Sequence, residues 1–276
     1  MKIIADSSSL YSSKEAKEKG FTILPVSITM NGKSYKDYDE ILPDALLSFM
    51  MQGAIPKSSQ PAIGEILEAY TSTDEDILVL TVGDGLSGTY SNAVGAKQSL
   101  ENNNHIHVVD TQTLAGAFHY LVEKANRLKN EGIPIEQIKT ELQTSIQNSL
   151  SYVIPTNFTF LKRSGRLSPI AANAAGFMKI VPTLTLSEDR RKIELLTMTR
   201  TFKKALEEII KHMKKHGVNE DYQISVSHAG VYEKAKDALE QIKQQFANTT
   251  FELFELSPSL MLHGGPGCIV IQAIKR

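Results

Sequence analysis

Short β-rich runs alternate with helical patterns through the first half of the chain, and this alternation restricts the fold more than any other feature. Buried strands are predicted at residues 2–5, 77–82 and 106–110. Between them, apolar residues recur at helical spacing, as in the segment 61–70. Strands separated by helices are typical of a parallel sheet with crossover helices, so we expect an α/β architecture here.

Two local signals add detail to this half. Ser12 and Glu15 form a capping-box pattern that predicts a helix start. Residues 21–30 read as one strand, and the Asn31-Gly32 dipeptide after it is a strong hairpin-turn signal. We therefore expect a β-hairpin in addition to the parallel sheet.

The second half has a different pattern. Residues 179–187 and 192–199 read as two strands around a charged turn, which predicts an antiparallel hairpin. Further elements are predicted at 202–215 (helix), 222–227 (strand), 232–246 (helix), 251–256 (strand) and 268–274 (strand). Because the helix-rich parallel pattern ends near Leu150, we predict two domains, residues 1–150 and 151–276.

The composition excludes several classes of protein. The length of 276 residues exceeds one average domain and suffices to bury a core without disulfides. A net charge of -1 provides no global basic field for nucleic acid, so we expect no nucleic-acid partner. Cys268 is the single cysteine, which excludes a disulfide framework within the chain and predicts a reducing, cytoplasmic location.

Other expectations follow from patterns that the sequence lacks. The first residues contain no long apolar segment of the secretory type, and no run approaches ~18 apolar residues, so we expect neither secretion nor a membrane span. The histidines show neither His-Glu-x-x-His nor cysteine-pair spacing. We therefore expect no metal and no cofactor.

The most informative segment is Val82–Tyr90 (VGDGLSGTY), which places glycines and hydroxyls between a buried strand and a helix N-terminus. Free backbone N–H groups and the helix dipole converge there, and Ser87 or Thr89 adds a hydroxyl, so the loop suits an oxyanion. An ordinary capped turn has the same composition. The segment matches neither the GxGxxG nor the P-loop pattern, which removes most support for nucleotide binding.

Lys57–Pro61 (KSSQP) supplies a second pair of hydroxyls, at the predicted entrance of the next helix. A helix cap alone would explain this pair. In an α/β domain, however, ligands gather beyond the carboxyl ends of the strands. Ser58, Ser59 and Ser87 could therefore converge on one carboxylate.

His263 and Arg166 are candidates for the positive partner of such a carboxylate. His263 opens the segment HGGPG, whose glycines allow close approach of the backbone, and its ring can donate to a carboxylate or act as an acid or base. Arg166 lies in the segment SGRLS. A structural hydrogen bond of His263 and an exposed Arg166 at a helix end are the alternatives.

An enzymatic alternative uses three of these positions. Ser87, Asp110 and His263 occur in the chain order of the α/β-hydrolase triad, which would make the protein a serine hydrolase of acyl esters. The nucleophile elbow of those enzymes needs Gly-x-Ser-x-Gly, whereas Gly88 follows Ser87 directly. We therefore treat the hydrolase as the second reading.

A basic cluster opens the predicted helix 202–215. Arg200, Lys203 and Lys204 lie at its N-terminus, where the helix dipole disfavours cations. The cluster suits docking to an acidic partner surface or a transient contact with anionic membrane headgroups, and solvated charge is the alternative.

Six segments, taken in order, resemble the DegV family, the fatty-acid-binding proteins that serve bacterial fatty acid kinase. The resemblance extends over essentially the whole chain. Its segments are Asp6–Ser8 (DSS), Ser58–Pro61 (SSQP), Leu86–Tyr90 (LSGTY), Phe160–Ser168 (FLKRSGRLS), Arg200–Leu206 (RTFKKAL) and His263–Gly267 (HGGPG).

The resemblance implies an N-terminal three-layer α/β/α domain with a parallel sheet and a C-terminal mixed sheet covered by helices. It implies one long-chain fatty acid, whose carboxylate lies at the domain junction near Ser58, Ser59, Ser87, Arg166 and His263. The site implied for docking of the fatty acid kinase is Arg200, Lys203 and Lys204. The chain would then be a carrier without catalytic turnover of its own, and the kinase would convert the bound acid to an acyl phosphate.

The sequence departs from the family pattern in three places. Ser58 stands where Thr is usual, which keeps the hydroxyl. Residues 181–184 (VPTL) replace Lys-Pro-Ile-Leu, and Met261-Leu262 stands where Gly-Thr often precedes the histidine. The small-residue stretch 170–178 (IAANAAGFM) would either line part of the lipid tunnel or form a tight helix-packing seam.

Overall fold

The first half of the chain forms the expected parallel sheet. The computed structural model describes residues 1–173 and 180–276. Four strands lie in the order β2 (Thr22–Leu24), β1 (Lys2–Asp6), β6 (Ile77–Thr81) and β7 (Ile106–Asp110), and all neighbouring strands are parallel. Strand β6 is buried at every position, as expected for a strand covered on both faces.

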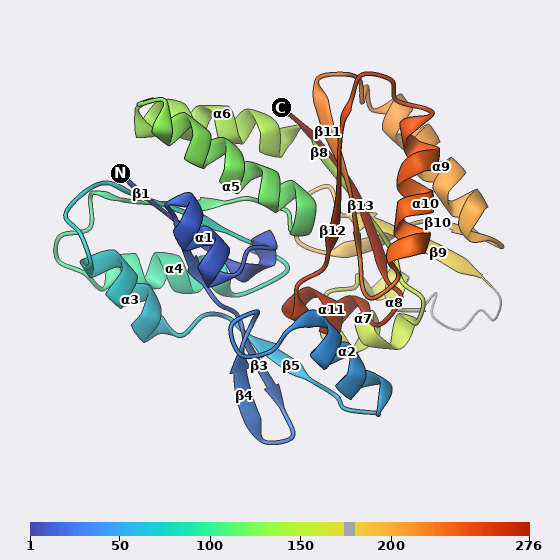
Figure 1. The fold of residues 1–276 in the computed structure, drawn as a ribbon, viewed down its shortest axis with the longest axis horizontal. Helices are drawn as coiled ribbons and strands as arrows, with labels where there is room; N and C mark the ends of the chain where they lie inside the picture. Colours follow the sequence, from blue (N-terminus) through green and yellow to red (C-terminus); the bar gives the residue numbers. More distant parts are fainter. Residues whose placement is uncertain (174–179) are drawn as a thin grey trace.

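Helices cover both faces of this sheet, which gives three layers (Figure 1). Helices α3 (Ile63–Thr71) and α4 (Thr89–Gln98) pack on one face, against residues such as Ile4 and Val79. Helices α1 (Ser13–Lys19) and α5 (Ala115–Asn130) pack on the other face, with α6 (Ile135–Gln147) against α5. The capping box predicted at Ser12 and Glu15 forms at the start of α1.

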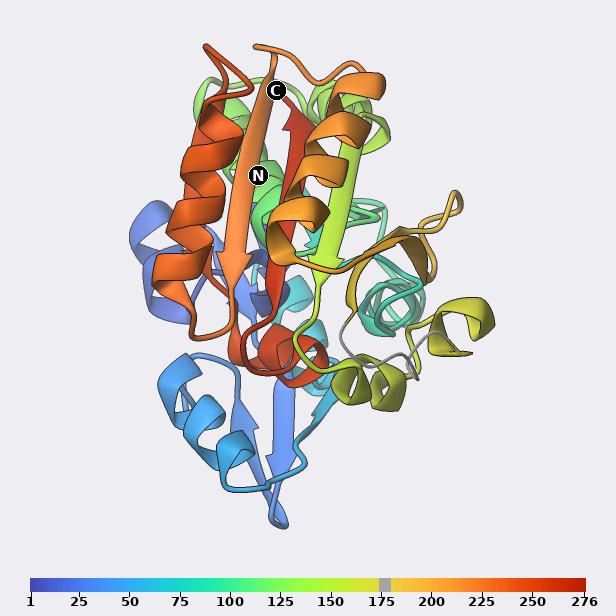
Figure 2. The same ribbon diagram turned by 90° about the vertical axis from the view of Figure 1, so that its right-hand side faces the viewer.

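The second half forms a separate six-stranded mixed sheet. Its order is β10 (Ile193–Thr199), β9 (Val181–Leu186), β8 (Ser149–Ile154), β13 (Ile269–Lys275), β11 (Tyr222–His228) and β12 (Thr250–Glu255). Neighbours are antiparallel except β11 and β12. Helices α9 (Phe202–Lys215) and α10 (Tyr232–Lys243) cover one face (Figure 2). Helices α5 and α6 contact the other face through β13. The expected fold class is confirmed.

A third, small sheet corrects one prediction. Residues 21–30 do not form a single strand, because Pro25 lacks the N–H that a continued ladder requires. The chain instead leaves the parallel sheet after β2 and enters β3 (Ser27–Met30), which pairs antiparallel with β4 (Lys33–Lys36) and β5 (Lys57–Ser59). The hairpin predicted at Asn31-Gly32 is confirmed. Helix α2 (Pro43–Met51) follows β4.

Short helices fill the space where the sheets approach one another. These are a 3₁₀ turn, η1 (Ser7–Ser9), and helices α7 (Phe158–Ser164), α8 (Pro169–Asn173) and α11 (Pro258–Gly264). Helix α11 contacts α2, α7, β3, β5 and η1. It therefore joins the small sheet to both larger units.

The fold leaves two features as predictions, the domain division at residue 150 and the role of the stretch 170–178. The two larger sheets use strands before residue 111 and after residue 148, but α5 packs against both, so the proposed division at residue 150 is not tested. Most of the stretch 170–178 lies outside the described residues. Among the helices of the described part of the chain, none is long and apolar enough to cross a bilayer.

Candidate functional site

The carboxyl ends of the parallel strands open onto a cavity. Ser8 follows β1, Val82 and Ser87 follow β6, and Leu114 follows β7, and all four residues line it. Ligands of open α/β sheets bind at this edge. The opposite wall comes from the second half of the chain, including Val153 of β8 and Val270 of β13.

The cavity is a narrow apolar slot with polar groups at some positions. It holds about 740 Å³ of space free of protein atoms, part of which is open to solvent. Its apolar lining is Val26, Val82, Leu86, Leu114, Val153, Leu161, Ile193, Leu256, Leu260, Cys268 and Val270, and its polar lining is Ser8, Ser58, Ser87, Ser164, Arg166, Ser259 and His263. Such a lining suits a slender amphipathic ligand.

Ser58 and His263 meet in this lining from positions 205 residues apart in the sequence. The Ser58 Oγ lies 2.8 Å from the His263 Nε2, and the tautomer of the ring decides which of the two donates. Ser58 belongs to strand β5, not to a helix entrance, because the next helix begins only at Ile63. His263 belongs to the last turn of α11, before the glycine-rich loop begins at Gly265. The two residues are close to each other, as the resemblance implies, but the helix entrance predicted for Ser58 is wrong.

The environment of His263 keeps its ring neutral. Burial among protein atoms, together with the nearby Arg166 guanidinium, lowers the pKa of His263 to about 3. Part of the ring still faces the cavity. A neutral imidazole can donate or accept one hydrogen bond at Nε2, so His263 can contribute hydrogen bonding to a head group but no positive charge.

Arg166 supplies the positive charge. Its Nε donates to the Leu86 carbonyl at 3.0 Å and its Nη1 donates to the Ser164 carbonyl. These bonds fix the guanidinium beside the loop that carries Ser87. Burial lowers the pKa of Arg166, and no carboxylate among the described residues lies within 4 Å of it. A half-buried cation without a protein counter-ion favours an anionic ligand.

Ser87 completes the polar group, and its contacts argue against the hydrolase. The Ser87 Oγ lies 2.9 Å from the Thr89 Oγ1, not beside His263. Asp110 accepts from the backbone N–H groups of Asp84 and Gln112. Within residues 1–173 and 180–276, Ser87, Asp110 and His263 therefore form no hydrogen-bonded chain, which a triad requires.

Comparison with known proteins identifies the family of this chain. A family model described as "Uncharacterised protein, DegV family" matches residues 1–276. The chain belongs to the DegV family. A DegV domain-containing protein of Staphylococcus aureus is 27% identical over 278 residues, covering 99% of this chain and 98% of that protein.

Solved DegV structures share the whole fold. A structure described as fatty acid binding of a DegV family protein from Thermus thermophilus has a TM-score of 0.88 and 25% identity, covering 100% of this chain and 99% of that one. A DegV family protein from Eubacterium eligens loaded with heptadecanoic acid has a TM-score of 0.86 and 22% identity, with complete coverage of both chains. These DegV proteins bind fatty acids.

One expected residue of this DegV chain lies away from the slot. Alternation along β5 exposes Ser59 and Lys57 on the face opposite Ser58, and Ser59 does not line the cavity. The extended conformation of β5 is the reason, because in a helix cap both hydroxyls could have turned inward.

The sequence did not indicate Ser259, a polar residue of the slot, or Asp37, which binds Ser259 but does not line the slot. Asp37 accepts a hydrogen bond from the Ser7 Oγ at 2.7 Å and from the Ser259 N at 3.1 Å. It thereby ties the small sheet to η1 and α11. Burial raises the pKa of Asp37 to about 7. The Ser-Pro pair at residues 257–258, a common helix start, was the one available signal for Ser259.

The predicted docking residues of this family member lie on the surface. Arg200, Lys203 and Lys204 are exposed around the start of α9. Met198, two residues before Arg200, lines a surface groove that also contains Arg163. Arg163 in turn shares a second cavity with Arg166 and His263. Arg163 thus lines both the groove that contains Met198 and the cavity that contains Arg166 and His263.

Proposed function

We propose that this protein binds one long-chain fatty acid in the slot and presents its carboxylate to a separate ATP-dependent fatty acid kinase. Ser58, Ser87 and His263 would hydrogen-bond the carboxylate, and Arg166 would balance its charge. The observation that carries the proposal is a largely apolar slot whose lining includes the half-buried Arg166, which pairs with no carboxylate of the described residues. The fatty acids bound by similar DegV proteins support it.

The acyl chain and the carboxylate of the ligand contribute unequally to the binding free energy. Burying about 14 methylenes contributes on the order of 11 kcal/mol, at about 0.8 kcal/mol each. Association costs of at least ~4 kcal/mol oppose it. A hydrogen bond from a hydroxyl to the carboxylate contributes only about 1–3 kcal/mol. The acyl chain would therefore set affinity, and the polar residues would set orientation.

The proposed reaction takes place on the kinase, not on this chain. A carboxylate oxygen would attack the γ-phosphorus of ATP held by the kinase. The new P–O bond would form as the bond from that phosphorus to the bridging oxygen breaks, and ADP would leave with the electron pair. The carrier would hold the carboxylate in place and keep the acyl phosphate from water. The exposed cluster of Arg200, Lys203 and Lys204 would meet the kinase.

Native mass spectrometry of the purified protein tests the ligand. We expect one stoichiometric adduct with the mass of a fatty acid, released on denaturation. Protein recovered without lipid that also fails to bind added palmitate would contradict the proposal. Labelling of Ser87 by a fluorophosphonate would instead favour the hydrolase.

A further inference from the structure

Two histidines at the end of helix α9 lie next to each other on one side of the helix. His212 and His216 are four residues apart, and residues at this spacing are neighbours on a helix surface. Their rings stack with centres 4.0 Å apart and planes inclined by 26°. Zinc metalloproteases hold their metal with two histidines at the same spacing. Met213 stands where those enzymes have a catalytic Glu, so the pair is suited to binding a metal ion and not to hydrolysis.

The hydrogen bonds of the two rings leave one nitrogen of each ring free. The His216 Nδ1 lies 2.8 Å from the His212 carbonyl oxygen. A carbonyl can only accept, so this nitrogen carries the proton and the Nε2 of the neutral ring has a lone pair. The His212 Nδ1 lies 2.8 Å from the Tyr152 hydroxyl, which can donate or accept. When the hydroxyl accepts, the His212 Nε2 also has a lone pair. Neither Nε2 forms a hydrogen bond within the described residues.

Each ring is held by its other nitrogen, as in protein metal sites. A histidine that binds a metal usually donates its second ring N–H to a protein acceptor, which fixes the tautomer and the orientation of the ring. His212 has the hydroxyl of Tyr152, a fully buried residue of β8, and His216 has the His212 carbonyl. Capping of the helix end explains the bond of His216. It does not explain why the ring of His212 bonds to the sheet and stacks on that of His216.

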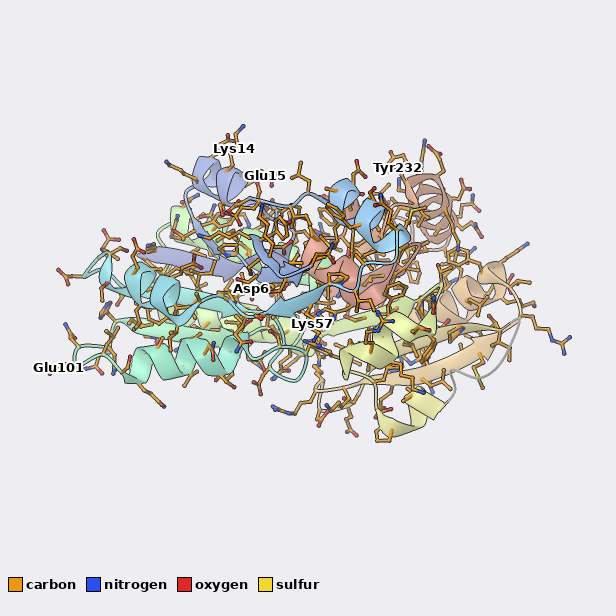
Figure 3. The ribbon with its side chains drawn as sticks, turned by 90° about the horizontal axis from the view of Figure 1, so that it is seen from below. Asp6, Lys14, Glu15, Lys57, Glu101 and Tyr232 are labelled. Atoms are coloured by element: carbon orange, nitrogen blue, oxygen red, sulfur yellow. The ribbon has the colours of Figure 1, made fainter. Side chains whose placement is uncertain are left out.

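The pair is accessible and lies away from the fatty acid site. His216 is exposed and His212 is half-buried, and neither lines the slot. The end of α9 is at the top of Figure 2, whereas Lys57, next to the slot residue Ser58, is labelled in the view from below (Figure 3). The carbonyl end of a helix dipole also favours a cation.

We propose that His212 and His216 bind one transition-metal ion through their Nε2 atoms, with water at the remaining positions. Imidazole nitrogens suit Zn²⁺, Ni²⁺ and Cu²⁺, whereas Mg²⁺ and Ca²⁺ take oxygen ligands. Within residues 1–173 and 180–276, no group of three or more His, Cys, Asp and Glu could share a metal ion, so the site is open. Because stacked rings direct their lone pairs side by side, the exposed His216 ring would turn slightly to reach the ion held by His212.

Isothermal titration calorimetry with ZnCl₂ at neutral pH tests this site, on protein that carries no histidine tag and has been freed of metal by EDTA and dialysis. We expect the wild-type protein to bind one Zn²⁺ per chain and MgCl₂ to give no binding heat. His216→Gln, which removes one ligand at an exposed position, should weaken Zn²⁺ binding at least ~10-fold. Tyr152→Phe keeps both ligands and removes the partner of His212, and it should weaken binding about 10-fold.

His107→Gln is the matched control, because His107 is a half-buried histidine of β7 outside the pair. This variant should bind Zn²⁺ as the wild-type protein does. Zn²⁺ should also raise the melting temperature of the wild-type protein more than that of His216→Gln. Absence of saturable Zn²⁺ binding by the wild-type protein, or equal affinity in His216→Gln, would overturn the inference. Equal weakening by His107→Gln would overturn it too, since the ion would then bind elsewhere.

Discussion

Ser58 and Ser59 are adjacent in the sequence and differ in what they contact. The Ser58 Oγ is 2.8 Å from the His263 Nε2 in the slot, whereas Ser59 is exposed on the other face of β5. We expect Ser58→Ala to weaken fatty acid binding about 5- to 150-fold, the effect of losing one hydrogen bond of about 1–3 kcal/mol to the carboxylate. Ser59→Ala, the matched control, should change the dissociation constant less than twofold. Equal effects in a displacement titration would show that the strand alternation does not govern the site.

Asp37 predicts a pH dependence of stability. Burial, the largest cause, raises its pKa to about 7, and the buried carboxylate of Asp6 also raises it, against the hydrogen bonds from Ser7 and Ser259. An acid whose pKa is higher in the folded state binds its proton more tightly there. The free energy of unfolding should therefore fall as pH rises from about 4 to about 7, by up to about 4 kcal/mol from this residue.

Asp37→Asn removes that loss, because an amide stays neutral and its oxygen can still accept from the Ser259 N. We expect the variant to gain stability relative to the wild-type protein between pH 5 and pH 8, measured by urea denaturation at both values. Asp39→Asn, at an exposed position two residues away, should give no such gain. If the free energies of unfolding of Asp37→Asn and the wild-type protein differed by the same amount at both pH values, the titration of this carboxylate would not explain the pH dependence.

At the scale of elements, long periodic segments were predictable and short ones were not. The helix expected at 202–215 forms with those bounds, and Leu206, Ile209 and Met213 are buried on its inner face. Strand β5 and helix α11 were not expected, and they carry Ser58 and His263. Each has at most seven residues, too few for a period to appear, and pairing with β3 and contacts of α11 decide their conformation.

The close contact between Gly85 and the β9–β10 hairpin predicts that a larger residue at position 85 destabilises the protein. A Cβ at Gly85 would lie 2.0 Å from the Arg191 Cα, at the tip of the β9–β10 hairpin. An ion pair of Arg191 with Asp84 holds the same contact. Gly85→Ala should therefore displace the hairpin from the loop that carries Ser87, reducing stability by about 1–3 kcal/mol and weakening fatty acid binding.

Gly95→Ala is the control for this substitution, because no atom lies within 4 Å of the added methyl and the residue is inside α4. It should raise stability by about 0.5–1 kcal/mol, the difference between Ala and Gly in a helix. Thermal unfolding and a binding titration measure both variants. Equal melting temperatures for Gly85→Ala and the wild-type protein would mean that the hairpin does not press on the loop.

The whole molecule assembles the site by packing one helix against two sheets. Helix α5 buries Phe118 and Leu121 completely, and a Cβ at Gly116 would lie 2.2 Å from the Ser225 Oγ of β11. The Gln272 side chain of β13 accepts from the Ala117 N and donates to the Ser151 Oγ. Such a satisfied, close-packed junction holds the two walls of the slot in a fixed relation. This long-range packing had no local signal in the sequence, whereas the family resemblance indicated its position.

The proposed docking of the kinase predicts the effect of reversing the charge of Arg200. Arg200 is exposed before α9 and does not line the slot, so its charge should matter to docking and not to lipid. Arg200→Glu should lower the rate of acyl-phosphate formation with the kinase at least ~10-fold, because a like-charge contact replaces an opposite one. Its lipid content by native mass spectrometry should equal that of the wild-type protein. Lys215→Glu, which reverses a charge at the far end of α9, should leave both quantities unchanged. If Arg200→Glu lost both its bound lipid and its rate of acyl-phosphate formation, Arg200 would act in lipid binding and not in docking. If both variants lowered that rate equally, the effect would come from net charge and not from a docking site.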